Sequence, residues 1–123
     1  MAVSKIAMNQ PESLFQRIWD SELGITVGSS GLFANTSYYD GKAVFISFEI
    51  PAWTPRANEI IVLGTLDSKY RPSQTVSAWG YTTNSSYANI QPISGQILAD
   101  GSIRAIFNGA NNNYTFYFAT YLL

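Results

Sequence analysis

Residues 114–123 read YTFYFATYLL, a stretch rich in β-forming residues with apolar or aromatic side chains at both odd and even positions. Because a β-strand alternates its side chains between two faces, this strand presents two such rows. One row contains Tyr114, Phe116, Phe118 and Leu122, and the other contains Tyr117, Ala119, Tyr121 and Leu123. The core of a small domain covers one face, and a second sheet or a neighbouring subunit must cover the other. We expect the first row to fill the core, and Tyr117, Tyr121 and Leu123 to contact neighbouring chains.

Short β patterns precede this strand at roughly ten-residue spacing. Residues 44–50 alternate most clearly after an Asp40-Gly41 turn, and residues 90–107 predict a hairpin with Asp100-Gly101 at its turn. Shorter strands are predicted over residues 23–27, 31–33, 59–63 and 75–79, of which 59–63 and 75–79 are expected to be buried. The prolines of residues 51–58 predict a loop, whereas residues 81–89 fit either an exposed loop or a solvated strand. About seven or eight strands predict an all-β fold, an antiparallel β-barrel or jelly-roll-like domain.

The N-terminal part of the chain contains the helix-like spacing. Apolar residues recur at helical intervals within residues 12–19. We expect one short helix there with Trp19 in the core, because so short a helix is stable only when its apolar side packs against the domain. Residues 1–22 then form a helical lead-in to a β-barrel of residues 23–123, and residues 1–123 form a single domain by length.

The chain contains neither cysteine nor histidine. Their absence removes thiolate nucleophiles, the commonest general base and nearly every zinc site, so the sequence argues against an enzyme and indicates no cofactor or metal. Among the acids, Glu49, Glu59 and Asp67 lie outside the turns and the helical segment, and no spacing pairs them for glycoside hydrolysis. Seven basic and eight acidic residues leave no basic stripe for nucleic acid. No stretch approaches the roughly 18 apolar residues of a membrane span.

Low charge combined with many aromatic residues suits polyol recognition. Charged residues make up 12% of the chain against roughly 25% in typical domains, while aromatic residues reach 15%. A flat ring covers the apolar face of a sugar, so Trp53, Trp79 and Tyr81 are candidates for ligand contact. Both tryptophans also fit a purely structural packing role. Arg104 and Arg71 are suited to gripping phosphate or carboxylate, although Arg71 also fits a role in bracing a loop through backbone carbonyls.

Three elements of the sequence together resemble a known family. Residues 63–72 read LGTLDSKYRP, an Asp100-Gly101 turn follows, and the chain closes with the aromatic strand that ends Tyr121-Leu122-Leu123. This combination resembles the C-terminal tip domain of tailed-phage fibre and baseplate proteins. It is most similar to the head domain of receptor-binding proteins from phages that infect lactic acid bacteria, such as lactococcal siphophages. The resemblance covers about residues 43–123.

The resemblance implies a function as well as a fold. It implies an antiparallel β-barrel or jelly roll, a homotrimer about a threefold axis, and a place in the virion at the tail tip or baseplate among other baseplate proteins. Such tips bind host cell-wall saccharide during adsorption, in sites that combine Trp with Asp, His and Arg. This chain lacks histidine, so that part of the pattern cannot be carried over. By residue type the resemblance points to Trp79, Asp100 and Arg104.

Other functions fit parts of the same pattern. A structural trimeric virion module without its own glycan site would use the aromatic residues for packing. A saccharide depolymerase would release new reducing ends from wall polysaccharide. An animal complement-type or tumour-necrosis-factor-like trimer head shares the aromatic terminal strand, but the Tyr70-Arg71-Pro72 loop argues against that class.

Overall fold

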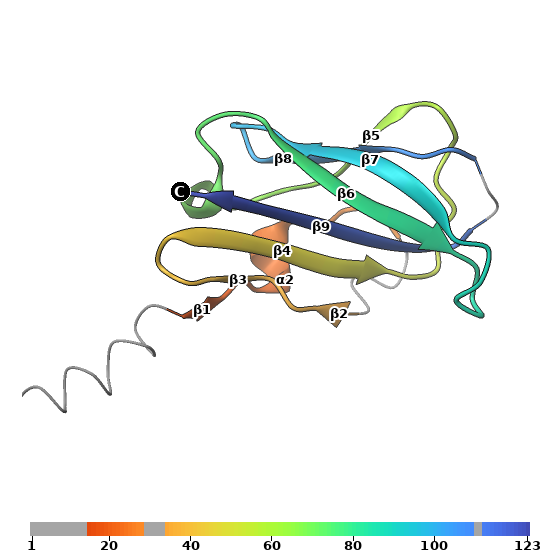
Figure 1. Cartoon of the computed structure of the whole chain (residues 1–123), viewed down its shortest axis with the longest axis horizontal. Coiled ribbons are helices and arrows are strands. Elements are labelled where there is room, and N and C mark those ends of the chain that lie inside the picture. The colour runs from red at the N-terminus through yellow and green to blue at the C-terminus, as the bar shows by residue number, and fades with distance from the viewer. Residues whose placement is uncertain (1–14, 29–33, 110–111) are drawn as a thin grey trace, which may run out of the picture.

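The computed structural model describes residues 15–28, 34–109 and 112–123. Nine antiparallel strands form one curled, half-barrel sheet, which confirms the all-β prediction (Figure 1). The hydrogen-bonded order is β1 (Gln16–Arg17), β3 (Tyr38–Tyr39), β4 (Ala43–Ile50), β9 (Tyr114–Leu122), β6 (Val76–Thr83), β7 (Gln91–Ile97), β8 (Ser102–Ile106) and β5 (Ile60–Thr65). The strand β2 (Ala34–Asn35) pairs with β4 beside β3. A one-turn helix α2 (Asp20–Leu23) and a 3-10 turn η1 (Ser68–Tyr70) complete the described elements.

Strand β9 lies in the middle of the sheet, between β4 and β6. It pairs with β4 from Ala43–Leu122 to Ile50–Thr115, and with β6 from Trp79–Phe118 to Thr83–Tyr114. Both edges of the strand are therefore paired, and one of its faces points into the curl while the other points outward.

The prediction of which row of β9 faces the core was wrong. Tyr117 and Tyr121 are buried in the core, whereas Leu122 is 76% exposed. The hydroxyl of Tyr117 donates to the carbonyls of Gln96 and Arg104 at 3.2 and 3.0 Å. The hydroxyl of Tyr121 donates to the Tyr70 carbonyl at 2.6 Å. These partners make burial of the two phenols favourable, so neither tyrosine is on a surface that can contact another chain.

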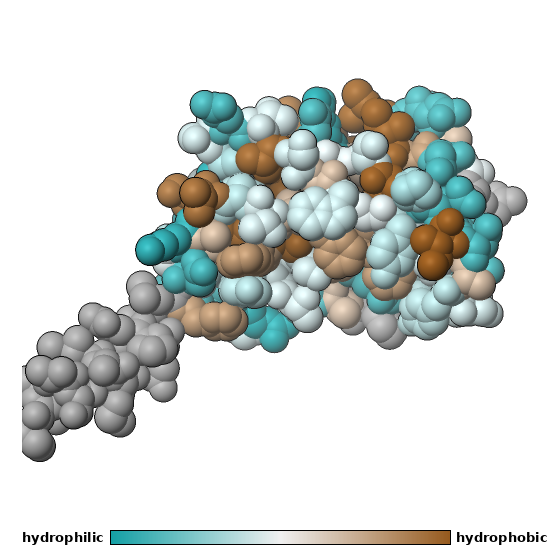
Figure 2. All heavy atoms as spheres, in the orientation of Figure 1, coloured by the Kyte–Doolittle hydropathy of each residue, from teal (hydrophilic) through white to brown (hydrophobic). Residues whose placement is uncertain are grey.

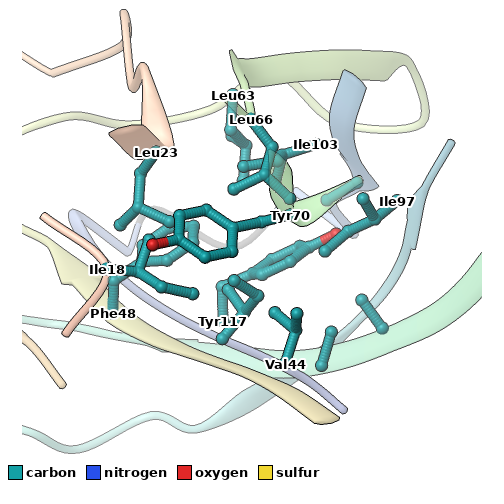
Figure 3. Packing of buried hydrophobic residues seen from close by; sticks show 14 of the residues in the cluster. Ile18, Leu23, Val44, Phe48, Leu63, Leu66, Tyr70, Ile97, Ile103 and Tyr117 are labelled. Carbon is teal, nitrogen blue, oxygen red and sulfur yellow. The ribbon is translucent and has the colours of Figure 1, made fainter. Parts of the chain in front are cut away.

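Tyr117 lies at the centre of the packed interior (Figure 3). Its ring stacks on Phe48 of β4 with centroids 5.2 Å apart. On β7, Gly95 leaves the space that the ring occupies, because a Cβ there would lie 2.8 Å from the Tyr117 hydroxyl oxygen. Burial raises the pKa of Tyr117 well above its ordinary value, so its hydroxyl keeps its proton and remains a donor.

The segment before and after α2 closes the open side of the curl. At one end, the Ile18 amide donates to the Ser37 carbonyl at 3.0 Å, next to β3. At the other end, the Thr26 amide donates to the Leu63 carbonyl of β5 at 2.9 Å. The short connection through α2 thus joins strands from the two edges of the sheet and covers the core.

The helix predicted over residues 12–19 was wrong in its described part. Gln16 and Arg17 form β1, and α2 begins only at Asp20; residues 12–14 lie outside the described residues. Extended backbone places Ile18 in the core and leaves Trp19, which we expected there, 57% exposed. The Arg17 guanidinium instead lies 4.7 Å from the centre of the Trp19 ring, a cation–π contact at the surface.

The other strand predictions were partly confirmed. The strand over residues 44–50, the 90–107 hairpin and the 51–58 loop are confirmed. The strand predicted over 75–79 extends to Thr83, so residues 81–89 begin as strand and continue as loop. Residues 23–27 do not form a strand; Ile25 makes only an isolated β-bridge, to Gly64. The strand predicted over residues 31–33 lies outside the described residues. The 59–63 segment was wrongly expected to be buried throughout, because β5 is an edge strand that exposes half its side chains. The same expectation was wrong for 75–79, because Ser77 and Trp79 lie on the exposed outer face of β6.

Candidate functional site

The outward side of β6 and β9, together with the loop that follows β6, carries a continuous set of aromatic rings. We call this set the aromatic face, and its residues are Trp79, Tyr81, Tyr87, Tyr114, Phe116 and Phe118. In the same orientation as Figure 1, the surface over β4, β9 and β6 is mostly pale or brown, and teal groups gather towards its margins (Figure 2).

Sheet register brings these rings together. Trp79 pairs directly with Phe118, and Tyr81 pairs directly with Phe116. Tyr81 and Phe116 stack with centroids 4.6 Å apart, and Trp79 and Phe118 stack at 6.3 Å. Each ring thereby fixes the orientation of its neighbour across the strands. Trp79 nevertheless remains 53% exposed, so a large part of its indole is free to contact a ligand.

A hollow adjoins Trp79 on the same side of the sheet. We call it the β7–β8 hollow; it is lined by Ile60, Ser77, Ser94, Gly95, Gln96, Arg104, Ala105 and Ile106. Ser94 is the direct cross-strand neighbour of Trp79, which places the hollow beside the indole ring. Arg104 donates through Nε and Nη2 to the Gln96 side-chain oxygen at 3.1 and 2.7 Å. This pair holds the guanidinium at the hollow, where hydroxyl, amide and guanidinium groups converge next to an aromatic ring.

Three of the predicted site residues lie elsewhere and stabilise the fold: Trp53, Arg71 and Asp100. The Trp53 indole N–H donates to the Thr115 hydroxyl at 3.1 Å, and its ring packs edge-on against Phe107. Arg71 donates from Nε to the Leu66 carbonyl at 2.8 Å, which is the loop-bracing role that the sequence left open. The sequence candidates therefore separate into Trp79, Tyr81 and Arg104 on one surface, and Trp53, Arg71 and Asp100 away from it.

Asp100 serves the hairpin turn. Its carboxylate accepts from the Ser102 amide at 2.9 Å. Hydrogen bonds from the Ser102 backbone and side chain lower the pKa of Asp100, and the nearby charges of Arg71 and Arg104 lower it further. This carboxylate is consequently ionised at neutral pH, and its bonds are used within the turn.

Glu49 is a residue of this surface that sequence reasoning did not select as a binding residue. It lies on β4 directly opposite Phe116, on the outward face, yet it is only 8% exposed. Burial raises the pKa of its carboxyl group. A hollow surrounds it, lined by Ala34, Thr36, Ser47, Phe48, Glu49, Phe116 and Phe118, which we call the Glu49 hollow.

A second exposed tryptophan offers a comparison. Trp19 follows the edge strand β1 and lines a hollow with Arg17, Glu22 and Lys69. Lys69 and Glu22 form a salt bridge of 2.7 Å there, and the Glu22 carboxylate raises the pKa of Lys69. This hollow is built from bonded charges rather than from stacked rings, so the two exposed tryptophans have different surroundings.

No protein-family model matches the chain, and no curated protein matches it. Within the described residues, no cluster of three or more acidic side chains is placed to hold a metal ion. No helix in the described part of the chain has the length and apolar character needed to cross a membrane.

Proposed function

We propose that this domain is a saccharide-binding adhesin head, with the ligand lying on Trp79 and reaching into the β7–β8 hollow. The observation that carries the proposal is a half-exposed indole, fixed by stacking, beside a hollow that presents Arg104, Gln96 and Ser94. Flat rings cover the apolar face of a pyranose, and neighbouring polar side chains bond its hydroxyl groups. In this surface Trp79 supplies the ring, while Arg104, Gln96 and Ser94 supply the donors and acceptors.

The finer proposal is that the adhesin belongs to a tailed phage and binds cell-wall saccharide of its bacterial host. It rests on the sequence resemblance of residues 63–72, the Asp100-Gly101 turn and the aromatic terminal strand. The lack of a basic stripe also favours a saccharide over nucleic acid as the ligand. Such heads act as trimers, and several weak sites on one virion multiply the effective concentration of ligand.

A trimer requires an exposed apolar surface, and the one available here borders the saccharide site, because Ile60 and Ile106 also line the β7–β8 hollow. The edge strand β5 exposes Ile60 and Val62, and the neighbouring strand β8 exposes Ile106, so these three side chains form an apolar group. We place the subunit contact at this edge, because exposed edge strands and apolar groups are commonly covered by partners. Light scattering at micromolar concentration is expected to give the trimer mass; a monomer alone contradicts this part of the proposal.

Replacing Trp79 with alanine is expected to weaken binding to host wall polysaccharide by about tenfold or more. The change removes the stacking surface and the contact of Trp79 with Phe118, but it removes no side chain from the core. Titration calorimetry or surface plasmon resonance with immobilised polysaccharide measures the loss. The melting temperature should change only modestly, since a cross-strand aromatic pair contributes about 0.2–1 kcal/mol to the free energy of unfolding.

Trp19→Ala is the matched control, because Trp19 is exposed to a similar degree but lies beyond the edge strand β1. We expect it to leave saccharide binding unchanged. If Trp19→Ala weakens binding and Trp79→Ala does not, the platform has been assigned to the wrong tryptophan. If the wild-type domain binds no wall polysaccharide, the saccharide proposal is rejected.

A structural virion module is the second candidate, and the aromatic face is the observation that favours it. Stacked rings on a sheet also pack well against another protein. In that case the wild-type domain binds no saccharide, and Trp79→Ala reduces trimer stability or binding to a baseplate protein. The two functions are therefore separated by the same variant.

A further inference from the structure

The Glu49 carboxyl group is nearly buried, and its buried Oε2 atom has no hydrogen-bond partner among the residues that the structure describes. Neither of the two salt bridges in the described part of the chain includes Glu49, since they join Arg56 to Glu59 and Lys69 to Glu22. Buried carboxyl groups are ordinarily paired or hydrogen-bonded, so this group requires an explanation.

The surroundings of Glu49 are aromatic on one side and polar on the other. Phe116 faces it directly across the strands, and Phe118 lines the same hollow. Thr36 and Ser47 line the opposite part of the hollow. The pKa of the Tyr87 hydroxyl is raised, mainly by partial desolvation and secondly by the negative charge of Glu49. The charge of Glu49 therefore acts on a residue of the aromatic face.

This combination matches one kind of ligand group. A carboxylate attracts a positive charge and accepts its N–H hydrogen bonds, while the faces of aromatic rings attract cations. An ammonium group makes both kinds of contact. A neutral hydroxyl or N-acetyl group can bond the carboxylate or pack on the rings, but it brings no positive charge to either. A ligand ammonium would also remove the cost of leaving the buried carboxyl group without a partner.

We propose that the Glu49 hollow binds the ammonium group of an unacetylated amino sugar in the ligand. The inference rests on the proposed saccharide function and specifies its substrate class. Phe116 connects the two parts of the site, because it belongs to the aromatic face and lines the Glu49 hollow. A chain of sugars lying over β6 and β9 therefore reaches both Trp79 and Glu49.

The test compares two ligands that differ only in their amino groups: the glucosamine trimer and its fully N-acetylated counterpart. Titration calorimetry is carried out below the pKa of the sugar amine. We expect the wild-type domain to bind the glucosamine trimer about tenfold more tightly, the effect of one charge-assisted hydrogen bond. We expect Glu49→Gln, which keeps the side-chain shape and removes the charge, to lose this preference and to bind the acetylated trimer as before.

The outcomes separate the inference from the function on which it rests. If Glu49→Gln keeps the preference, or if the wild-type domain shows none while still binding either trimer through Trp79, the inference is wrong and the saccharide function stands. If neither trimer nor wall polysaccharide binds, both are wrong. Should Glu49→Gln fold poorly, the backbone amide resonance of Glu49 in the wild type decides: it must shift with the glucosamine trimer and stay in place with the acetylated one.

Discussion

Replacing Tyr117 with alanine is expected to lower the free energy of unfolding by about 3–5 kcal/mol, the range found for truncating a fully buried aromatic side chain. A domain of this size is stable by only about 5–15 kcal/mol, so the variant should lose much of its stability. The ring is fully buried, stacks on Phe48 and fills the space left by Gly95. Chemical denaturation followed by tryptophan fluorescence measures the change.

Tyr117→Phe isolates the contribution of the hydroxyl group. It keeps the ring but leaves the Gln96 and Arg104 carbonyls without this donor, at a cost of about 1–3 kcal/mol. A loss in Tyr117→Phe equal to that in Tyr117→Ala would mean that packing of the ring contributes nothing. A loss near zero in both variants would contradict the placement of Tyr117 in the core.

The raised pKa values of Tyr117 and Tyr121 provide a further check on burial. Between the ordinary tyrosine pKa of 10.0 and the higher folded-state values, the unfolded chain has released protons that the folded chain retains. Stability is therefore fully present below pH 10.0 and falls as the pH rises above it. Tyr117→Phe should show a shallower alkaline loss of stability than the wild type.

Gly64→Ala is expected to lower the free energy of unfolding by about 3 kcal/mol, the upper end of the usual cost of overpacking. A Cβ at this position would lie 2.5 Å from the Gly24 carbonyl oxygen and 2.8 Å from the Ile25 Cα. Both are backbone atoms of the segment that closes the curl, so no side-chain rotation relieves the clash. The segment must move away from β5.

Hydrogen exchange locates the damage in Gly64→Ala. The Thr26 amide, which donates to the Leu63 carbonyl, should exchange faster, while the central amides of β9 retain most of their protection. Thr65→Ala is the matched control, because Thr65 is the exposed neighbour on β5 and should change stability by less than about 0.5 kcal/mol. Unchanged stability in Gly64→Ala would show that the closing segment does not pack on β5.

Local sequence patterns predicted most of the long strands, but they did not reliably predict which side chains of a strand face the core. Alternation in β4 identified its buried row correctly, because its apolar residues face one way. In β9 both rows are apolar or aromatic, and hydropathy alone favours phenylalanine over tyrosine for the core. The order is reversed because the Tyr117 and Tyr121 hydroxyls meet backbone carbonyls from other elements, and nothing near β9 in the sequence indicates those partners.

The candidate site shows the same limit. Trp79 and Tyr81 could be selected from residue type and position, but their stacking partners Phe118 and Phe116 depend on the register between β6 and β9. Glu49 was grouped with unpaired acids because its burial arises from Phe116 across the strands and from the neighbouring β2. Period-two alternation does place Glu49 on the mixed face of β4, and this was the signal that pointed towards it.

The most direct test of the account is the position of the saccharide, and the three tryptophan indole N–H resonances report it in one spectrum. Labelled wild-type domain is titrated with fragments of host wall polysaccharide. We expect the Trp79 resonance to shift progressively, while those of Trp53, bonded to Thr115, and Trp19, beyond β1, stay in place. A saturating titration in which Trp19 shifts and Trp79 does not, or in which no indole resonance moves, would contradict it.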